Sequence, residues 1–247
     1  MRLILEKRAD RSPFFAIASP FLALLLTLIA GGLIFVMRGI NPLEGLYVYF
    51  VEPLTQLWSV EQLIVKAAPL VLIGVGLAVC YMANVWNIGA EGQLTMGAIA
   101  GGIAPVMFPD WQDPSILVVM LIMGAMGGAL YGAIPGLLKT RFNANEILTS
   151  LMLVYVAALF LDWLVRGPWR DPQGFNFPVT KTFVGWQLLP TLGGTIHLGA
   201  LFALLACVAL AFVMGKTLVG FGIKVTGSAP RAGRFAGFSR NRMVMLC

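Results

Sequence analysis

The chain has 247 residues, of which 59% are hydrophobic and only 11% are charged, and its formal net charge is +6. Soluble globular domains carry about 25% charged residues, so this composition excludes a soluble domain and indicates that lipid is the solvent. The 17 Lys and Arg residues are spread between apolar segments, which excludes a basic face for nucleic acid. Three Cys without a CxxC pair and a single His predict no disulfide framework, no metal site and no cofactor.

Apolar segments of roughly 20 residues, the length that crosses a bilayer, recur along the chain. They predict an all-α fold, a polytopic transmembrane helical bundle of about six spans, at residues 14–37, 63–83, 88–108, 115–138, 147–165 and 196–214. The first follows a basic segment, 1–13, but exceeds a signal-peptide core of roughly 7–15 residues, so we expect a retained anchor. Residues 14–247 are interpreted as a single transmembrane domain.

The last five residues, 243–247, begin another apolar run that stops short of a spanning length. We therefore expect a truncated chain, incomplete at its C-terminus, from which further spans are missing.

Basic residues are concentrated in alternate segments between the predicted spans. The N-terminus, 139–146 and 215–242 together hold twelve of the 17 Lys and Arg residues, whereas 41–62 carries acids. The positive-inside rule therefore places the N-terminus and the two internal basic segments in the cytoplasm. On the opposite side we expect an interfacial helix within 41–62 and a structured loop at 166–195, which is rich in Pro, Gly and aromatic residues.

The fourth predicted span contains four glycines at intervals of four, Gly124, Gly128, Gly132 and Gly136. This spacing aligns them on one helix face, where a neighbouring helix can approach closely. The pattern favours a helix-packing role, and the alternative is a groove for substrate.

Glu91 lies at the start of an apolar run and is flanked by Gly89 and Gly92. An acid at membrane depth costs at least about 2.5 to 3.5 kcal/mol, so it must face protein, a polar cavity or the interface. The glycines permit a broken or re-entrant backbone and hence a protein-enclosed polar site. Equally, Glu91 is explained as an interfacial acid that complements the dipole at a helix N-terminus.

For the fifth span, Asn145 is predicted as the N-cap and Glu146 as an acid of the first turn.

Three motifs occur in an order that resembles one family of transporters. Residues 62–97, with the core WNIGAEGQ at 86–93, are similar to the signature region of ABC importer permeases of the branched-chain amino acid and ribose type, especially the nucleoside and simple-sugar branch. The run 145–153 (NEILTSLML) resembles a second family motif, and 220–238 resembles the cytoplasmic loop that contacts the ATPase.

The resemblance implies a permease subunit of an ATP-driven importer in a bacterial plasma (inner) membrane, working by alternating access. It implies as partners ABC ATPase subunits, a second homologous permease subunit, an extracytoplasmic substrate-binding protein and membrane lipid, with ATP hydrolysis in the separate ATPase subunits. It also implies two groups of functional residues. The translocation path and signature comprise Asn87, Gly89, Glu91, Gly92, Gln93, Asn145 and Glu146, and the ATPase-coupling residues are Pro230, Arg231, Arg234, Phe235 and Gly237.

Residues 220–238, here named the coupling segment, are predicted to form the short helix that docks into the ATPase. Pro230 suits the first turn of a helix, where its missing N–H costs nothing, and Arg231 and Phe235 then share one face. The alternative is a basic loop held against anionic lipid, where each Lys or Arg contributes about 1 kcal/mol.

Two other classes of function compete with the importer. A secondary transporter or channel driven by an ion gradient commonly keeps ionisable groups within its spans, and here Glu91 and Asp162 are the candidates. An integral-membrane enzyme needs a clustered nucleophile, acid–base pair or metal ligands, and the sequence presents no such set.

Overall fold

The computed structural model describes residues 13–175 and 177–247, so nearly all of the basic segment expected at 1–13 lies outside the described residues. The regular secondary structure of the described residues is helical apart from one short hairpin. It divides into two compact units, within Met1–Leu63 and Ile64–Cys247, which are taken separately below.

The first unit contains α1 (Pro13–Met37), α2 (Pro42–Phe50), α3 (Glu52–Thr55) and the beginning of α4 (Leu57–Met82). Asn41 caps α2, because its Oδ1 accepts the Leu43 N–H at 3.1 Å. A Cβ atom at Gly45 would lie 2.9 Å from the Phe35 ring, so α2 folds back closely on the end of α1. A helix is therefore present where the sequence predicts one within 41–62.

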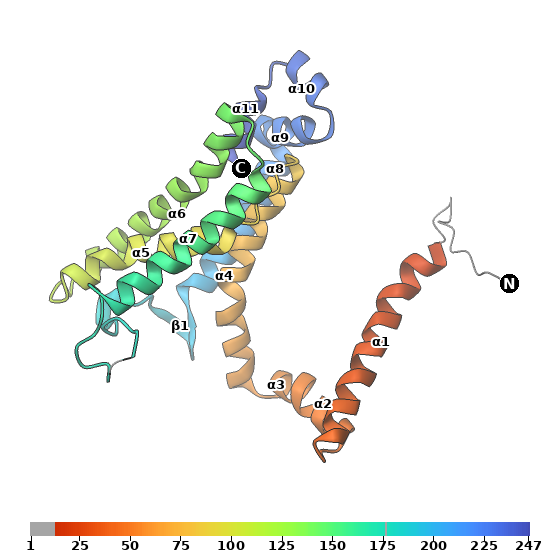
Figure 1. Ribbon diagram of the computed structural model, residues 1–247, viewed down its shortest axis with the longest axis vertical. Coiled ribbons are helices and arrows are strands. Elements are labelled where there is room, and N and C mark those ends of the chain that lie inside the picture. The colour runs from red at the N-terminus through yellow and green to blue at the C-terminus, as the bar shows by residue number, and fades with distance from the viewer. Residues whose placement is uncertain (1–12, 176) are drawn as a thin grey trace. The chain divides into compact units, whose positions relative to one another are not determined.

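The second unit begins within α4 and contains the remaining elements (Figure 1). Its helices are α5 (Ala90–Met107), α6 (Pro114–Phe142), α7 (Glu146–Arg166), α8 (Leu198–Lys216), α9 (Leu218–Ser228), α10 (Pro230–Phe235) and α11 (Arg240–Leu246). Between α7 and α8 lie the 3-10 turn η1 (Gly185–Gln187) and an antiparallel hairpin of β1 (Thr191–Gly193) and β2 (Ile196–His197). The hairpin pairs Thr191 with His197 and Gly193 with Ile196.

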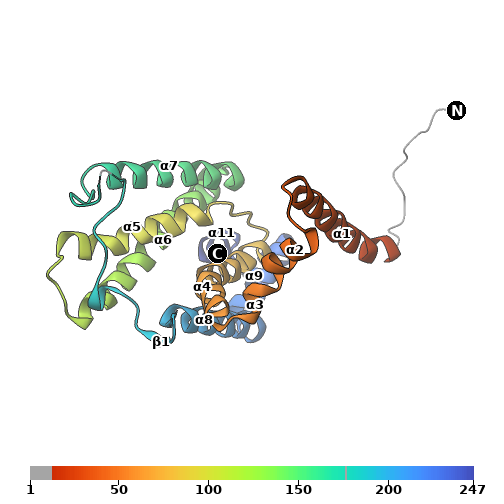
Figure 2. The same ribbon diagram turned by 90° about the horizontal axis from the view of Figure 1, so that it is seen from below.

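Among the described residues, five helices are long and apolar enough to cross a membrane, namely α1, α4, α6, α7 and α8. The predicted all-α polytopic bundle is confirmed. The third predicted span forms α5, a helix of 18 residues that is not among the five. It packs against both α6 and α7, as Figure 2 shows from below. Because α5 faces protein on these sides, small and polar residues replace the apolar side chains that lipid would require.

The glycine edge of α6 lies where α5 approaches. A Cβ at Gly97 of α5 would be 2.9 Å from the Gly124 carbonyl oxygen, and one at Gly128 would be 3.2 Å from the Gln93 carbonyl oxygen. Gly132 instead faces the Gln93 side chain, and Gly136 faces Met245 of α11 at 3.2 Å. The absence of side chains on this edge therefore lets two backbones come close and also leaves room for two neighbouring side chains.

Connections of the second unit gather at its two ends (Figure 1). At one end, α9 packs on the end of α4, since a Cβ at Gly227 would meet the Met82 carbonyl oxygen, and Thr140 of α6 lies 4.0 Å from the Met245 sulfur. At the other end, the Gln187 amide donates to the Pro109 carbonyl at 3.4 Å. The two internal basic segments thus share one end, and the described residues of the loop predicted at 166–195 lie at the opposite end.

Candidate functional site

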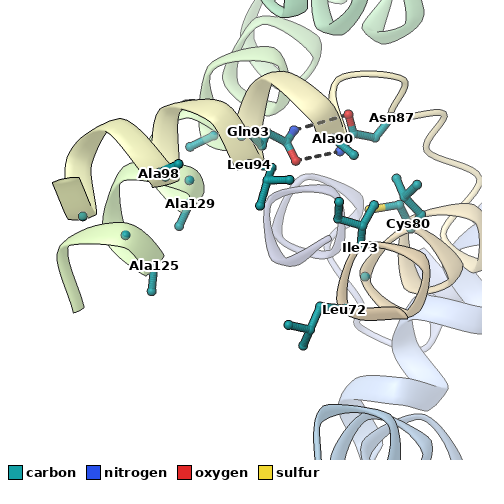
Figure 3. Close-up of a pocket in the computed structure, with 18 of the residues that line it drawn as sticks. Leu72, Ile73, Cys80, Asn87, Ala90, Gln93, Leu94, Ala98, Ala125 and Ala129 are labelled. Carbon is teal, nitrogen blue, oxygen red and sulfur yellow. Dashed lines mark hydrogen bonds between the residues drawn. The ribbon is translucent and has the colours of Figure 1, made fainter. Parts of the chain in front are cut away.

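A cavity of about 1040 Å³ lies inside the second unit, between α4, α5 and α6. Its walls are largely apolar, and Figure 3 shows Leu72 and Ile73 of α4, Leu94 of α5, and Ala125 and Ala129 of α6 around it. The glycine edge of α6 forms part of the same wall. The same helix face therefore packs against α5 and also lines the cavity.

Two carboxamides, Asn87 and Gln93, form the polar part of the cavity wall and are named the amide pair below. Asn87 Nδ2 donates to Gln93 Oε1 at 3.2 Å, and Gln93 Nε2 donates to Asn87 Oδ1 at 3.3 Å (Figure 3). Asn87 Oδ1 also accepts the Gly89 N–H at 2.8 Å, which fixes the turn before α5. Two bonds between the amides hold both side chains in one orientation.

The backbone before α5 is irregular, and the buried Ser150 of α7 binds it. The Ile88 N–H donates to Ser150 Oγ at 3.1 Å, and that hydroxyl donates to the Ile147 carbonyl at 3.3 Å. A Cβ at Gly89 would be 2.9 Å from Ser150 Cβ, and one at Gly92 would be 2.9 Å from Val154 Cα. Both signature glycines are thus required by close approach to α7. The set of residues predicted as functional omits Ser150, although it lies within the recognised run 145–153.

An ion pair joins the adjoining ends of α6 and α7. Lys139 Nζ contacts the Glu146 carboxylate, and the two side chains are 12% and 17% exposed. Both residues line the cavity. Asn145 caps α7 as predicted, since its Oδ1 accepts the Ile147 N–H at 2.9 Å. The sequence predicts Glu146 as a helix-start acid but does not reveal Lys139 as its partner, because the pairing is set by the turn between two helices.

Glu91 is exposed, in the first turn of α5, and does not line the cavity. The described residues alone therefore do not enclose Glu91 in a polar site, which is one of the two readings that the sequence leaves open. The reason is helical geometry: Gly92 points to α7 and Gln93 to the cavity, so the neighbouring Glu91 projects on a different face. Its position at the start of a helix agrees with the macrodipole reading.

Comparison with known proteins assigns the chain to a family. Residues 59–247 match the model of the family described as branched-chain amino acid transport system, permease component. The chain belongs to this permease family. No solved structure matches the permease.

Several curated relatives resemble this permease over most of its length. A glucose ABC transporter permease protein of Haloferax volcanii is 34% identical over 99% of this chain and 67% of its own. A guanosine ABC transporter permease protein of Bacillus subtilis is 28% identical over 92% of this chain and 66% of its own. A nucleoside ABC transporter permease protein of Lactococcus lactis is 27% identical, with 92% and 65% covered. The permease thus spans about two thirds of the length of these relatives.

The coupling segment of the permease folds into two helices, α9 and α10. Pro230 occupies the first turn of α10, as predicted, and Gly237 follows the helix with a φ of 86°. Arg231, Arg234 and Phe235 are exposed, and the Phe235 side chain is 94% exposed. This segment lies outside the cavity wall. Of the first predicted group, Asn87, Gln93 and Glu146 line the cavity, whereas the exposed residues of the coupling segment lie apart from it.

Proposed function

We propose that this permease is a membrane subunit of an ATP-driven ABC importer that carries nucleosides or simple sugars across a bacterial plasma membrane by alternating access. The observation that supports this most is the cavity between α4, α5 and α6, whose wall contains Asn87 and Gln93 of the recognised signature. The names of the glucose, nucleoside and guanosine permeases among its relatives support the choice of substrates.

The proposed assembly contains a second, homologous permease, two ABC ATPase subunits and an extracytoplasmic substrate-binding protein, all held together at the membrane. ATP is hydrolysed in the ATPase subunits, not in this chain. The N-terminus and the two internal basic segments face the cytoplasm in this proposal, which accords with the distribution of Lys and Arg and with the shared end that both segments occupy.

In this proposal α10 carries the contact with the ATPase. A phenylalanine that is 94% exposed on a short helix offers a large apolar anchor for a pocket on a partner. Arg231 lies four residues before it and adds a charge on the same face. The buried Gly233 brings α10 close to Thr226 of α9, so movement at the ATPase is transmitted to the base of the helical bundle.

At the same end of the bundle, the Lys139–Glu146 ion pair ties α6 to α7 beside the cavity. We propose that this pair holds the cytoplasmic end of the translocation path closed and opens when ATP drives the two helices apart. Asn145 and Glu146 then close the translocation path. Gly89 and Gly92 allow the signature residues to pack closely against α7.

Uptake by the whole transporter tests the proposal. The full-length permease is reconstituted into proteoliposomes with its partner permease, ATPase subunits and binding protein, and entry of radiolabelled D-glucose and guanosine is followed. We expect uptake of at least one probe that requires ATP and persists when ion gradients are abolished. Uptake that follows a proton or sodium gradient and ignores ATP would contradict the proposal.

A further inference from the structure

Among the described residues, the charged side chains that line the cavity balance each other. Among the described residues that line it, Lys139 and Glu146 are the charged ones, and they are bonded to each other. A charged group entering this cavity would lose its hydration without gaining a counter-ion, which is costly at low dielectric. A zwitterion such as an amino acid would leave two such groups unpaired.

Among the uncharged side chains that line the cavity, accessible hydrogen-bonding capacity is concentrated in the amide pair. Ser150 uses its hydroxyl on the Ile88 N–H and the Ile147 carbonyl, and it is 1% exposed. Gln187 uses its side-chain oxygen on the Val184 N–H and its nitrogen on the Pro109 carbonyl. Both groups keep some unused capacity, but Gln187 is 5% exposed and Ser150 is 1% exposed, so they offer little of it to the cavity.

The amide pair, in contrast, offers part of its capacity to the cavity. A carboxamide offers two N–H donors and two acceptor lone pairs. Asn87 and Gln93 each donate one N–H to the other, so one N–H remains on each nitrogen. Gln93 Oε1 keeps one lone pair, whereas Asn87 Oδ1 has both engaged. The pair is only partly buried and presents two donors and one acceptor in a fixed arrangement (Figure 3).

From the paired charges and the free donors and acceptor of the amide pair, we propose that the permease cavity itself selects uncharged cargo. The amide pair recognises neighbouring hydrogen-bond donors and acceptors on that cargo. The inference rests on the proposed function and adds a selecting element within the permease to that of a binding protein. Sugar hydroxyl pairs and the edges of nucleobases both present this chemistry. Gly132 is a positioning residue here, because a Cβ at that position would be 3.3 Å from the Gln93 amide and would press on it.

Substitutions at Gln93 test the proposal in the reconstituted transporter with one binding protein throughout, so that any change in uptake belongs to the permease. The probes are D-glucose, guanosine and L-leucine. Gln93→Met keeps the length of the side chain and removes its hydrogen bonds, and we expect uptake to fall roughly tenfold. Gln93→Glu adds an unpaired charge to the neutral wall and should lower uptake further. Asn84→Asp is the matched control, because Asn84 is exposed, lies outside the cavity and should keep uptake unchanged.

Each outcome decides a different point. A loss for guanosine alone assigns the amide pair to the nucleobase, and an equal loss for glucose assigns it to sugar hydroxyls. If Gln93→Met takes up the probes as fast as the wild type, recognition by the amide pair is wrong. If Gln93→Glu does so, or if the wild type takes up L-leucine rapidly, selection for neutral cargo is wrong. Variants are compared at equal amounts of assembled ATPase complex, which removes folding defects from the comparison. A wild-type transporter that takes up none of the probes with ATP counts against the proposed function instead.

Discussion

Replacement of single glycines by alanine at the contact between α5 and α6 should destabilise the permease in proportion to how closely the helices approach. A Cβ at Gly97 would lie 2.9 Å from the Gly124 carbonyl oxygen, about half an ångström inside ordinary contact, and the neighbour is backbone that cannot rotate away. At Gly128 the corresponding distance is 3.2 Å and at Gly124 it is 3.4 Å, whereas Gly74 of α4 has nothing within 4 Å.

The size of the effect follows from two opposing terms. Alanine gains about 1 kcal/mol over glycine inside a helix, and this gain is common to all four positions. Forcing a methyl group into a packed contact costs about 1 to 3 kcal/mol. Relative to Gly74→Ala, we therefore expect Gly97→Ala to lower the free energy of unfolding by about 1 to 3 kcal/mol, with Gly128→Ala and Gly124→Ala in between.

Unfolding of the purified permease by a denaturing detergent, followed by tryptophan fluorescence, measures these differences. The order of stability should be Gly74→Ala, Gly124→Ala, Gly128→Ala and Gly97→Ala, from highest to lowest. If Gly97→Ala proves as stable as Gly74→Ala, the close approach of α5 to α6 is not what holds this part of the bundle together, and the reasoning is refuted.

Three further predictions concern the ends of the bundle. Phe235→Ala should reduce ATPase co-purification and uncouple ATP hydrolysis from uptake, because it removes an apolar anchor and no charge; unchanged coupling would point to lipid contact instead. Charge reversal by Lys139→Glu should cost about 3 kcal/mol of stability and impair transport, and the double exchange with Glu146→Lys should restore both; an unaffected single variant would argue against the ion pair as a closing element. A cysteine introduced at residue 224 should react with a membrane-impermeant thiol reagent only from the cytoplasmic side, and labelling from outside would reverse the proposed orientation.

The main helices were predictable from sequence because lipid imposes a simple rule on the residues that face it. Apolar runs of spanning length predicted α4, α6, α7 and α8, with bounds that mostly differ by only a few residues. The run 88–108 likewise predicted α5, although α5 is less apolar than the five candidate spans, because it packs against α6 and α7 and its composition reflects contact with protein. Pro230 predicted the start of α10 because its fixed φ and missing N–H suit a first helical turn.

The candidate site was predictable only in part. The unusual composition of the signature drew attention to Asn87 and Gln93, but their pairing depends on a turn whose shape hydropathy does not encode. The same limit explains Glu91: the cost of an acid in lipid requires a polar environment, yet it does not say which face of α5 provides it. Lys139 and Ser150 were missed because each acquires its role through a contact with another helix.

Substrate protection of introduced cysteines tests most directly whether the cavity between α4, α5 and α6 is the translocation path. Ala129 lines the cavity, whereas the adjacent Leu130 is 67% exposed and lies outside its wall. In the full transporter, with the native cysteines replaced by serine, Ala129→Cys should react with a small thiol reagent, and transported glucose or guanosine should slow that reaction. The rate at Leu130→Cys should not depend on substrate. Equal rates at Ala129→Cys with and without transported substrate would contradict the account.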